Sequence, residues 1–151
     1  MSSQSRSIAR NPRARHDYRI VETWEAGLVL TGTEVKSLRA GRASLVGAFA
    51  RVRNDEVWLE ALHIPPYEEG NRHNHDPLRT RKVLMHRREI RRLVGSLERK
   101  GFALVPLELY FKGSHAKVTL ALGQGKKEYD RREDLRRRDA ELEMARAARR
   151  R

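Results

Sequence analysis

The stretch FALVPLELYFKGSHAKVTLALG, residues 102–123, predicts the fold most directly. It holds two runs rich in β-branched and aromatic residues, separated by Gly113 and Ser114, and this is typical of two strands joined by a two-residue hairpin turn. In the second run, side chains are expected to alternate between the two faces of the strand. This places Val118, Leu120 and Leu122 toward a core, and Lys117, Thr119 and Ala121 outward.

Upstream of this hairpin the same kind of pattern recurs. Residues 18–26 (YRIVETWEA) predict a strand, and residues 45–53 and 56–64 predict a second hairpin that turns at Asn54 and Asp55. About five short strands in roughly a hundred residues favour a small closed barrel over a sandwich. The prediction is a mainly β fold, an OB-like antiparallel barrel with two or three short helices.

Two helices interrupt the strands. In residues 31–41 (TGTEVKSLRAG), Thr31 can cap the helix and Glu34 follows three residues later, as in a capping box. In residues 86–101 (HRREIRRLVGSLERKG), apolar residues recur at helical spacing and arginines fill the other face, with Gly101 expected to end the helix. Between these helices, residues 65–80 are rich in Pro, Gly, Asn and His and predict a long surface loop.

The charge distribution divides the chain into three parts. Of its 151 residues, positions 1–15 carry four arginines and no acid, and positions 126–151 carry eleven basic and seven acidic residues. We therefore expect a flexible basic arm (1–15), the barrel (16–124) and a basic tail (125–151). The net charge of +13 favours a polyanionic partner, nucleic acid above a membrane, because basic groups that neutralise phosphates release counterions.

The tail is predicted to fold only when it meets a partner. Oppositely charged pairs such as Glu128 with Arg132 sit at helical spacing, but each stabilises an isolated helix by only ~0.2–0.5 kcal/mol. With almost no apolar face to dock, the tail is expected to be disordered when free and helical when bound. Gly123 and Gly125 are expected to form a flexible joint before it.

Four sequence blocks, in one order, carry a resemblance to a known family. They are NPRARHDY (11–18), GTEVKSLRAG (32–41), RTRK (79–82) and GKKEYDRR (125–132). Together they resemble the SsrA-binding proteins, small protein B, of bacteria. The resemblance implies an OB-like barrel that binds the tRNA-like domain of transfer-messenger RNA (tmRNA) and delivers it to stalled ribosomes, where the nascent chain is tagged for degradation.

The resemblance implies RNA contacts on one barrel face, at Glu34, Leu84 and Lys117. Glu34 has two open roles, an RNA contact or the helix cap, and an apolar residue such as Leu84 is more often part of a core. Further implied contacts with tmRNA are Asn11, Arg13, Arg15, His16, Lys36 and Arg39. For His16, stacking on RNA and a local structural role are equally open.

In the tail, the resemblance implies a place in the ribosomal decoding centre and the empty mRNA channel. The residues concerned are Lys126, Lys127, Tyr129, Asp130, Arg131, Arg132, Arg136, Arg137 and Arg138. Tyr129 stands where other members can have histidine, and either ring can stack on a base. Further implied partners are the ribosome and, through the shared aminoacyl-tmRNA complex, elongation factor Tu, with no membrane, no cofactor and a cytoplasmic location.

Two other readings remain open at this point. His73, His75 and Asp76 resemble part of a metallo-hydrolase motif, although its second Asp-His arrangement is missing, and we expect neither a metal nor an enzyme here. The chain also fits a general OB-type translation factor or ribosomal protein that binds RNA without preference for tmRNA. With no cysteine, the sequence offers no disulfide or thiolate nucleophile.

Overall fold

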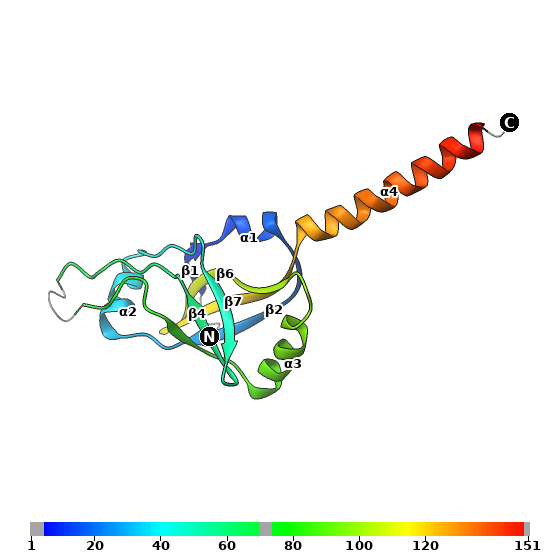
Figure 1. The fold of residues 1–151 in the computed structure, drawn as a ribbon. Coiled ribbons are helices and arrows are strands. Elements are labelled where there is room, and N and C mark those ends of the chain that lie inside the picture. Colours follow the sequence, from blue (N-terminus) through cyan, green and yellow to red (C-terminus); the bar gives the residue numbers. More distant parts are fainter. Residues whose placement is uncertain (1–4, 70–73, 150–151) are drawn as a thin grey trace.

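The computed structural model describes residues 5–69 and 74–149, and for residues 127–135 it describes the backbone alone. The strands are β1 (Ser5–Arg10), β2 (Tyr18–Leu28), β3 (Phe49–Arg53), β4 (Glu56–Glu60), β5 (Arg81–Leu84), β6 (Phe102–Lys112) and β7 (His115–Gly125). The helices are α1 (Pro12–Asp17), α2 (Gly32–Arg39), α3 (Arg87–Leu97) and α4 (Lys126–Arg149). Strands and helices lie as Figure 1 shows.

Six strands close into an antiparallel ring, in the order β3, β4, β5, β2, β7, β6 and back to β3. The long β6–β7 hairpin forms one wall of this ring, and β2 pairs with β7 along nearly its whole length. The weakest seam is between β6 and β3, which meet in register at Leu104 and Ala50. The predicted closed barrel of mainly β structure is therefore confirmed.

Both predicted hairpin turns are present. Asn54 and Asp55 have φ of 53° and 59°, the left-handed conformations that a tight two-residue hairpin turn requires. Gly113 has φ of 61° at the β6–β7 turn. These local conformations are ones that Asn, Asp and Gly adopt at low cost, which is why the sequence revealed them.

The barrel interior is filled by aliphatic side chains from every wall. Leu59, Leu109 and Leu120 are fully buried there, and Leu38 of α2 and Leu93 of α3 close the core. A second, smaller cluster lies outside the barrel, where α1 covers β6 and β7. Its buried members are Ala14, Val105, Leu107 and Ala121.

Ala121 follows the predicted alternation but is not exposed to solvent. Its side chain points out of the barrel as expected, but it is fully buried because α1 packs over it. Val118 and Leu120 are completely buried inside, as predicted. The sequence pattern could not show that a helix covers this part of the outer face.

In its described part, residues 5–15, the N-terminal segment is not the flexible arm that we expected over residues 1–15. Its described part forms β1, which pairs with β6 from Ser5 opposite Lys112 to Arg10 opposite Glu108, and then α1. Ile8 and Ala9 pack against the main core. The physical reason is that β3 pairs with only the first part of β6, which leaves an open strand edge whose backbone groups β1 satisfies.

Three further predictions about the elements were incomplete or wrong. The strand β5 was missed, because its core-facing Arg81 breaks the apolar alternation that marks a strand. The helix α3 ends at Leu97, earlier than Gly101. Gly123 and Gly125 belong to β7 rather than to a flexible joint, and a Cβ at Gly123 would lie 2.7 Å from the Cβ of Tyr18, so this glycine allows close packing.

Helix α4 continues directly from β7 and projects away from the barrel (Figure 1). Its main contacts with the rest of the described chain are near its base, with α1 and β7. The helical form expected for the tail is present, and its disorder without a partner stays a prediction. Among the described residues, no helix is long and apolar enough to cross a membrane.

Candidate nucleic-acid interface

Three neighbouring strands bring Leu84 and Lys117 together on the outside of the barrel. Gly27 of β2 pairs with Leu84 of β5 on one side and with Lys117 of β7 on the other. Directly paired residues of an antiparallel sheet project to the same face. Leu84 is 53% exposed, so this row of three faces solvent, and the expected proximity of Leu84 and Lys117 is found in the structure.

Gly27 has a steric reason to be glycine. A Cβ at this position would lie 3.3 Å from the Cβ of Leu84, closer than side chains normally pack. Because Gly27 has no side chain, the surface is recessed at the centre of this row, between the apolar Leu84 and the cationic Lys117. Such a row can receive a flat sugar or base edge from one side and a phosphate from the other.

Glu25 adds a carboxylate to the same face, two residues along β2 from Gly27. It accepts hydrogen bonds from the hydroxyl of Tyr110 and from Nζ of Lys112, the latter at 3.1 Å. The Tyr110 hydrogen bond, more than Lys112 and the charge of Lys117, holds the pKa of Glu25 below its ordinary value. Glu25 therefore stays an anion with oxygens accessible to solvent, since its side chain is 43% exposed.

Tyr110 of β6 pairs with Lys117, so it projects to the same outer face and fixes this carboxylate there. Its side chain is buried, and burial, followed by the hydrogen bond to Glu25, raises the pKa of Tyr110 to about 12. The phenol thus remains a donor at physiological pH. Glu25 was missed by the sequence reasoning, although the alternation of Trp24 and Ala26 inward and Glu25 outward was a signal that could have found it.

A hollow of about 350 Å³ extends this surface to α1. Its lining includes Arg15 of α1 and Thr119 of β7, and Thr119 pairs with Glu25. We call the combined outer surface the cross-strand face. Its members are Arg15, Thr119, Glu25, Lys117, Gly27 and Leu84.

The other candidates on α1 are placed as follows. Arg13 and His16 are exposed, and Nδ1 of His16 lies 3.1 Å from a carboxylate oxygen of Asp17. Asn11 has a structural role, because its side-chain amide donates to the carbonyl of Pro106 at 3.0 Å and its backbone N–H donates to the carbonyl of Leu107. This pair of bonds fixes the start of α1 on β6.

Glu34 does not lie on the cross-strand face, which corrects the expected meeting of three residues. Its side chain is fully buried. One carboxylate oxygen accepts from the backbone N–H of Thr31 at 2.8 Å and from Nη2 of Arg79 at 2.6 Å, and the other accepts from Nε of Arg81. Both carboxylate oxygens are buried and already accept hydrogen bonds, as a buried anion requires. Neither oxygen is therefore available to RNA in this arrangement.

The charges around Glu34 decide its protonation state. Burial alone would raise its pKa, but the hydrogen bonds from Arg79, Thr31 and Arg81 outweigh burial and hold the pKa of Glu34 below its ordinary value. Arg81 is also fully buried, and its guanidinium donates to the carbonyls of Leu62 at 2.5 Å and Pro77 at 3.2 Å. Glu34 therefore joins α2 to the C-terminal end of the loop that precedes β5, and Arg81 in turn reaches Leu62 at the start of that loop.

His75 also anchors this loop, and its contacts bear on the possibility that His73, His75 and Asp76 bind a metal ion. Nδ1 of His75 lies 2.9 Å from the hydroxyl of Thr33, and Nε2 lies 2.8 Å from the carbonyl oxygen of Ile64. Both ring nitrogens thus have polar partners within the protein, and His73 lies outside the described residues. Within the described part of the chain, no group of three or more acidic or histidine side chains is placed to hold a metal ion.

On α2, Lys36 and Arg39 are exposed and each cation lies over an aromatic ring. Nζ of Lys36 is 5.5 Å from the ring centre of Tyr67, and the guanidinium carbon of Arg39 is 5.2 Å from that of Phe111. These contacts orient the two cations along one side of the helix, three residues apart.

The tail candidates all lie on α4. Lys126 begins the helix, and Arg136, Arg137 and Arg138 are exposed along it. Five others fall where the side chains are outside the described residues: Lys127, Tyr129, Asp130, Arg131 and Arg132.

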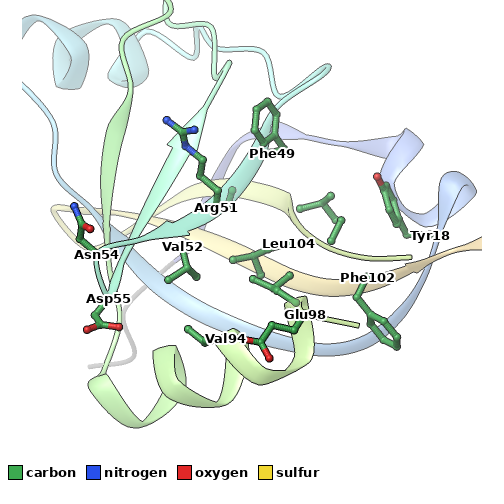
Figure 2. Close-up of a pocket in the computed structure, with 14 residues that line it drawn as sticks. Tyr18, Phe49, Arg51, Val52, Asn54, Asp55, Val94, Glu98, Phe102 and Leu104 are labelled. Carbon is green, nitrogen blue, oxygen red and sulfur yellow. The ribbon is translucent and has the colours of Figure 1, made fainter. Parts of the chain in front are cut away.

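A separate apolar groove of about 610 Å³ lies at the seam between β3 and β6, beside α3 (Figure 2). Leu104, Val52 and Val94 line it, and Phe49 and Phe102 lie toward its sides. The groove follows from the short β3–β6 pairing, which leaves the two strands incompletely joined. None of the residues that line the groove belongs to the cross-strand face.

Comparison with known proteins identifies the family. The SmpB protein family matches residues 8–150, nearly the whole chain. The chain belongs to the SmpB family. Among SmpB relatives, the SsrA-binding protein of Desulforudis audaxviator is 60% identical over 144 residues, covering 95% of this chain and 94% of the relative. That of Bacillus subtilis is 58% identical over 142 residues, covering 94% and 91%.

A solved SmpB structure also matches this fold. It is described as "tmRNA-SmpB: a journey to the center of the bacterial ribosome", and it aligns with a TM-score of 0.65 at 56% identity. The alignment covers 78% of this chain and 82% of the solved chain. At this identity the SmpB likeness extends to sequence as well as fold.

Proposed function

We propose that this protein binds tmRNA and acts with it in trans-translation, the rescue of stalled ribosomes. The observation that carries the proposal is the match to two SsrA-binding proteins, at 60% and 58% identity over nearly the full length of both chains. The solved SmpB structure, whose description joins tmRNA, SmpB and the bacterial ribosome, supports the same function. The protein is an RNA-binding component of this process rather than an enzyme, and its place of action is the cytoplasm.

The cross-strand face is the proposed site for the tRNA-like domain of tmRNA. Lys117 supplies a cation for a phosphate, and Leu84 supplies an apolar surface for a sugar or base. The ionised Glu25 accepts hydrogen bonds from a base edge or a 2′-hydroxyl, which a phosphate could not donate. Specificity for one RNA then rests on the carboxylate, while affinity rests on the cations.

Arg13, Arg15 and His16 extend the proposed contact along α1, and Lys36 and Arg39 extend it along α2. Glu34 contributes indirectly in this proposal, by holding Arg79 and Arg81 and so the position of β5, which carries Leu84. A carboxylate buried between two arginines suits this positioning role.

The tail is the proposed sensor of an empty ribosome. Its α4 helix projects from the barrel and carries exposed arginines, which suits a narrow channel lined by RNA. Lys126, Lys127, Tyr129, Asp130, Arg131 and Arg132 are proposed to contact the decoding centre, and Arg136, Arg137 and Arg138 the mRNA channel. Elongation factor Tu is a further proposed partner, through aminoacylated tmRNA.

The decisive experiment ends the chain after Gly125 and measures two properties. We expect near-normal affinity for the isolated tRNA-like domain, because the cross-strand face is intact, together with loss of nascent-chain tagging in a reconstituted stalled ribosome. A full-length chain with Tyr129→Ala tests the stacking role at saturating tmRNA. If truncation abolished binding of the tRNA-like domain, the division between barrel and tail would be wrong.

A matched pair of point variants tests the cross-strand face itself. Lys117→Ala should weaken binding of the tRNA-like domain, whereas Arg53→Ala, an equal change of charge at the far end of β3, should leave it nearly unchanged. The alternative of a general RNA-binding translation factor makes a different prediction. In that case unrelated tRNA would displace the tRNA-like domain equally well at the same salt concentration.

A further inference from the structure

The exposed side of α3 carries a line of arginines that the proposed function does not use. Arg88, Arg91, Arg92 and Arg99 are all exposed, and Gly95 is exposed among them. Successive helical residues are separated by about 100°, so Arg88, Arg91, Arg92 and Gly95 lie on one side of α3, and Arg99 follows just beyond its end. We call these five residues the α3 stripe.

The charges of the stripe are largely uncompensated within the described part of the chain. Arg92 pairs with Glu22 at 3.3 Å, but Arg88, Arg91 and Arg99 have no ion pair among the described residues. Arg88 also stands in the first turn of α3, where the helix dipole disfavours a cation, and the last turn has no basic residue. This distribution of positive charge along α3 therefore destabilises the helix, and helix stability does not explain it.

Gly95 is a second local feature that folding does not explain. It lies in the interior of α3, where glycine is less favourable than almost any other residue. A Cβ at this position would meet nothing within 4 Å, so no neighbouring part of the protein requires glycine there. Glycine among exposed arginines leaves the helix backbone open to close approach by another molecule.

We propose that the α3 stripe docks the sugar–phosphate backbone of double-helical RNA, with Gly95 at the point of closest approach. The arginines can form charge-assisted hydrogen bonds with phosphates, and α3 is about 16 Å long, enough to follow several of them. None of residues 87–97 is aromatic, so the stripe offers no surface on which unpaired bases could stack. A duplex backbone, read by shape and charge, is the RNA surface that suits it.

The stripe begins beside the cross-strand face and leads away from it. A hollow of about 480 Å³ is lined by Leu84 at the end of β5 and by Arg87 and Arg91 of α3. Arg99 marks the other end, past the last turn of the helix. This surface goes beyond the proposed function, which uses only the cross-strand face, α2 and the two ends of the chain.

The experiment uses the full-length protein and a mixed-sequence RNA duplex, with affinity measured across a range of salt concentrations. Gly95→Ala should raise Tm by about 2–4 °C through better helix propensity, yet weaken duplex binding, and Gly95→Gln should weaken it further. The control is Gly32→Ala, which adds the same methyl group at an open position of α2. It should leave duplex binding unchanged.

A charge experiment complements the glycine series. The double variant Arg88→Ala with Arg91→Ala should weaken duplex binding by about tenfold and lower the slope of log K against log salt by about 2. The control with equal charge, Arg42→Ala with Arg53→Ala, should have a clearly smaller effect. The proposal is overturned if both double variants weaken binding equally, or if Gly95→Gln binds the duplex as well as the unaltered chain.

Discussion

At the scale of single residues, Glu34 and Arg81 form a buried ion pair whose loss should be costly. Glu34→Gln keeps the size of the side chain but leaves the guanidinium of Arg81, fully buried, without its counter-charge. Removing one member of a buried pair typically costs about 3–5 kcal/mol. We expect a loss of unfolding free energy of that order, measured by urea denaturation at pH 7.

An exposed ion pair gives the control. Glu108→Gln removes the partner of Arg10, whose side chain is 76% exposed, and should change stability by less than about 1 kcal/mol. Equal effects of the two substitutions would contradict the assigned role of Glu34.

The pair also predicts a pH dependence. Because the pKa of Glu34 is held below its ordinary value of 4.5, the folded protein binds the proton of this group less readily than the unfolded chain. Its stabilising contribution is therefore complete above pH 4.5 and declines as the pH falls toward the folded-state pKa. The stability difference between the unaltered chain and Glu34→Gln should shrink across that acidic range.

The sequence predicts which face of a strand a site residue occupies, because inward and outward residues alternate along the strand. Lys117 was correctly directed outward, because it alternates with the buried Val118. Of the two roles left open for Glu34, the helix cap is present, because its carboxylate accepts from the backbone N–H of Thr31. Its burial against Arg79 and Arg81, more than forty positions away, could not be predicted from the sequence. Contacts between such distant residues leave no periodic signal in one sequence.

At the scale of elements, β1 should stabilise the barrel. Deleting residues 1–10 removes the strand that pairs with the C-terminal half of β6 and the packing of Ile8 against the core. We expect a loss of at least about 1 kcal/mol and a greater tendency to self-associate, because β6 would present an unpaired edge. Thermal unfolding and analytical ultracentrifugation measure the two effects.

The outcome for this deletion separates two descriptions of the N-terminal segment. A flexible arm would be removed without change in Tm or in the monomer fraction. As a control, replacing Arg6 and Arg10 by Ala in the full chain alters the charge while keeping the backbone pairing. Stability should then stay near that of the unaltered chain.

The elements that sequence predicted well are those specified by local chemistry. The two hairpins depend on Asn54, Asp55 and Gly113, whose conformations are local. The strands β1 and β5 depend instead on which edges the barrel leaves unpaired and on the buried Arg81, and both were missed. Short, polar strands of this kind form because of tertiary pairing, which overrides local propensity.

At the scale of the whole molecule, the barrel and α4 should behave as two units of very different stability. The barrel has a closed ring and a continuous core, whereas α4 contacts it mainly near its base and exposes all its described side chains from Arg136 onward. A helix without an apolar face to bury is marginal in water. Binding to an RNA surface can then supply the free energy that orders it.

This arrangement predicts two separate transitions. In the full chain, circular dichroism at 222 nm should show a helical signal from α4 that is small at low salt and declines gradually with temperature, before the barrel unfolds cooperatively. A chain ending at Gly125 should lose the gradual phase and keep the same Tm to within about 2 °C, because few contacts join α4 to the barrel. Adding a polyanionic RNA should increase the helical signal of the full chain and not that of the shortened one. A tail that stayed fully helical up to the Tm of the barrel would show instead that α4 is stable without a partner, and ribosome binding could not then be coupled to its folding.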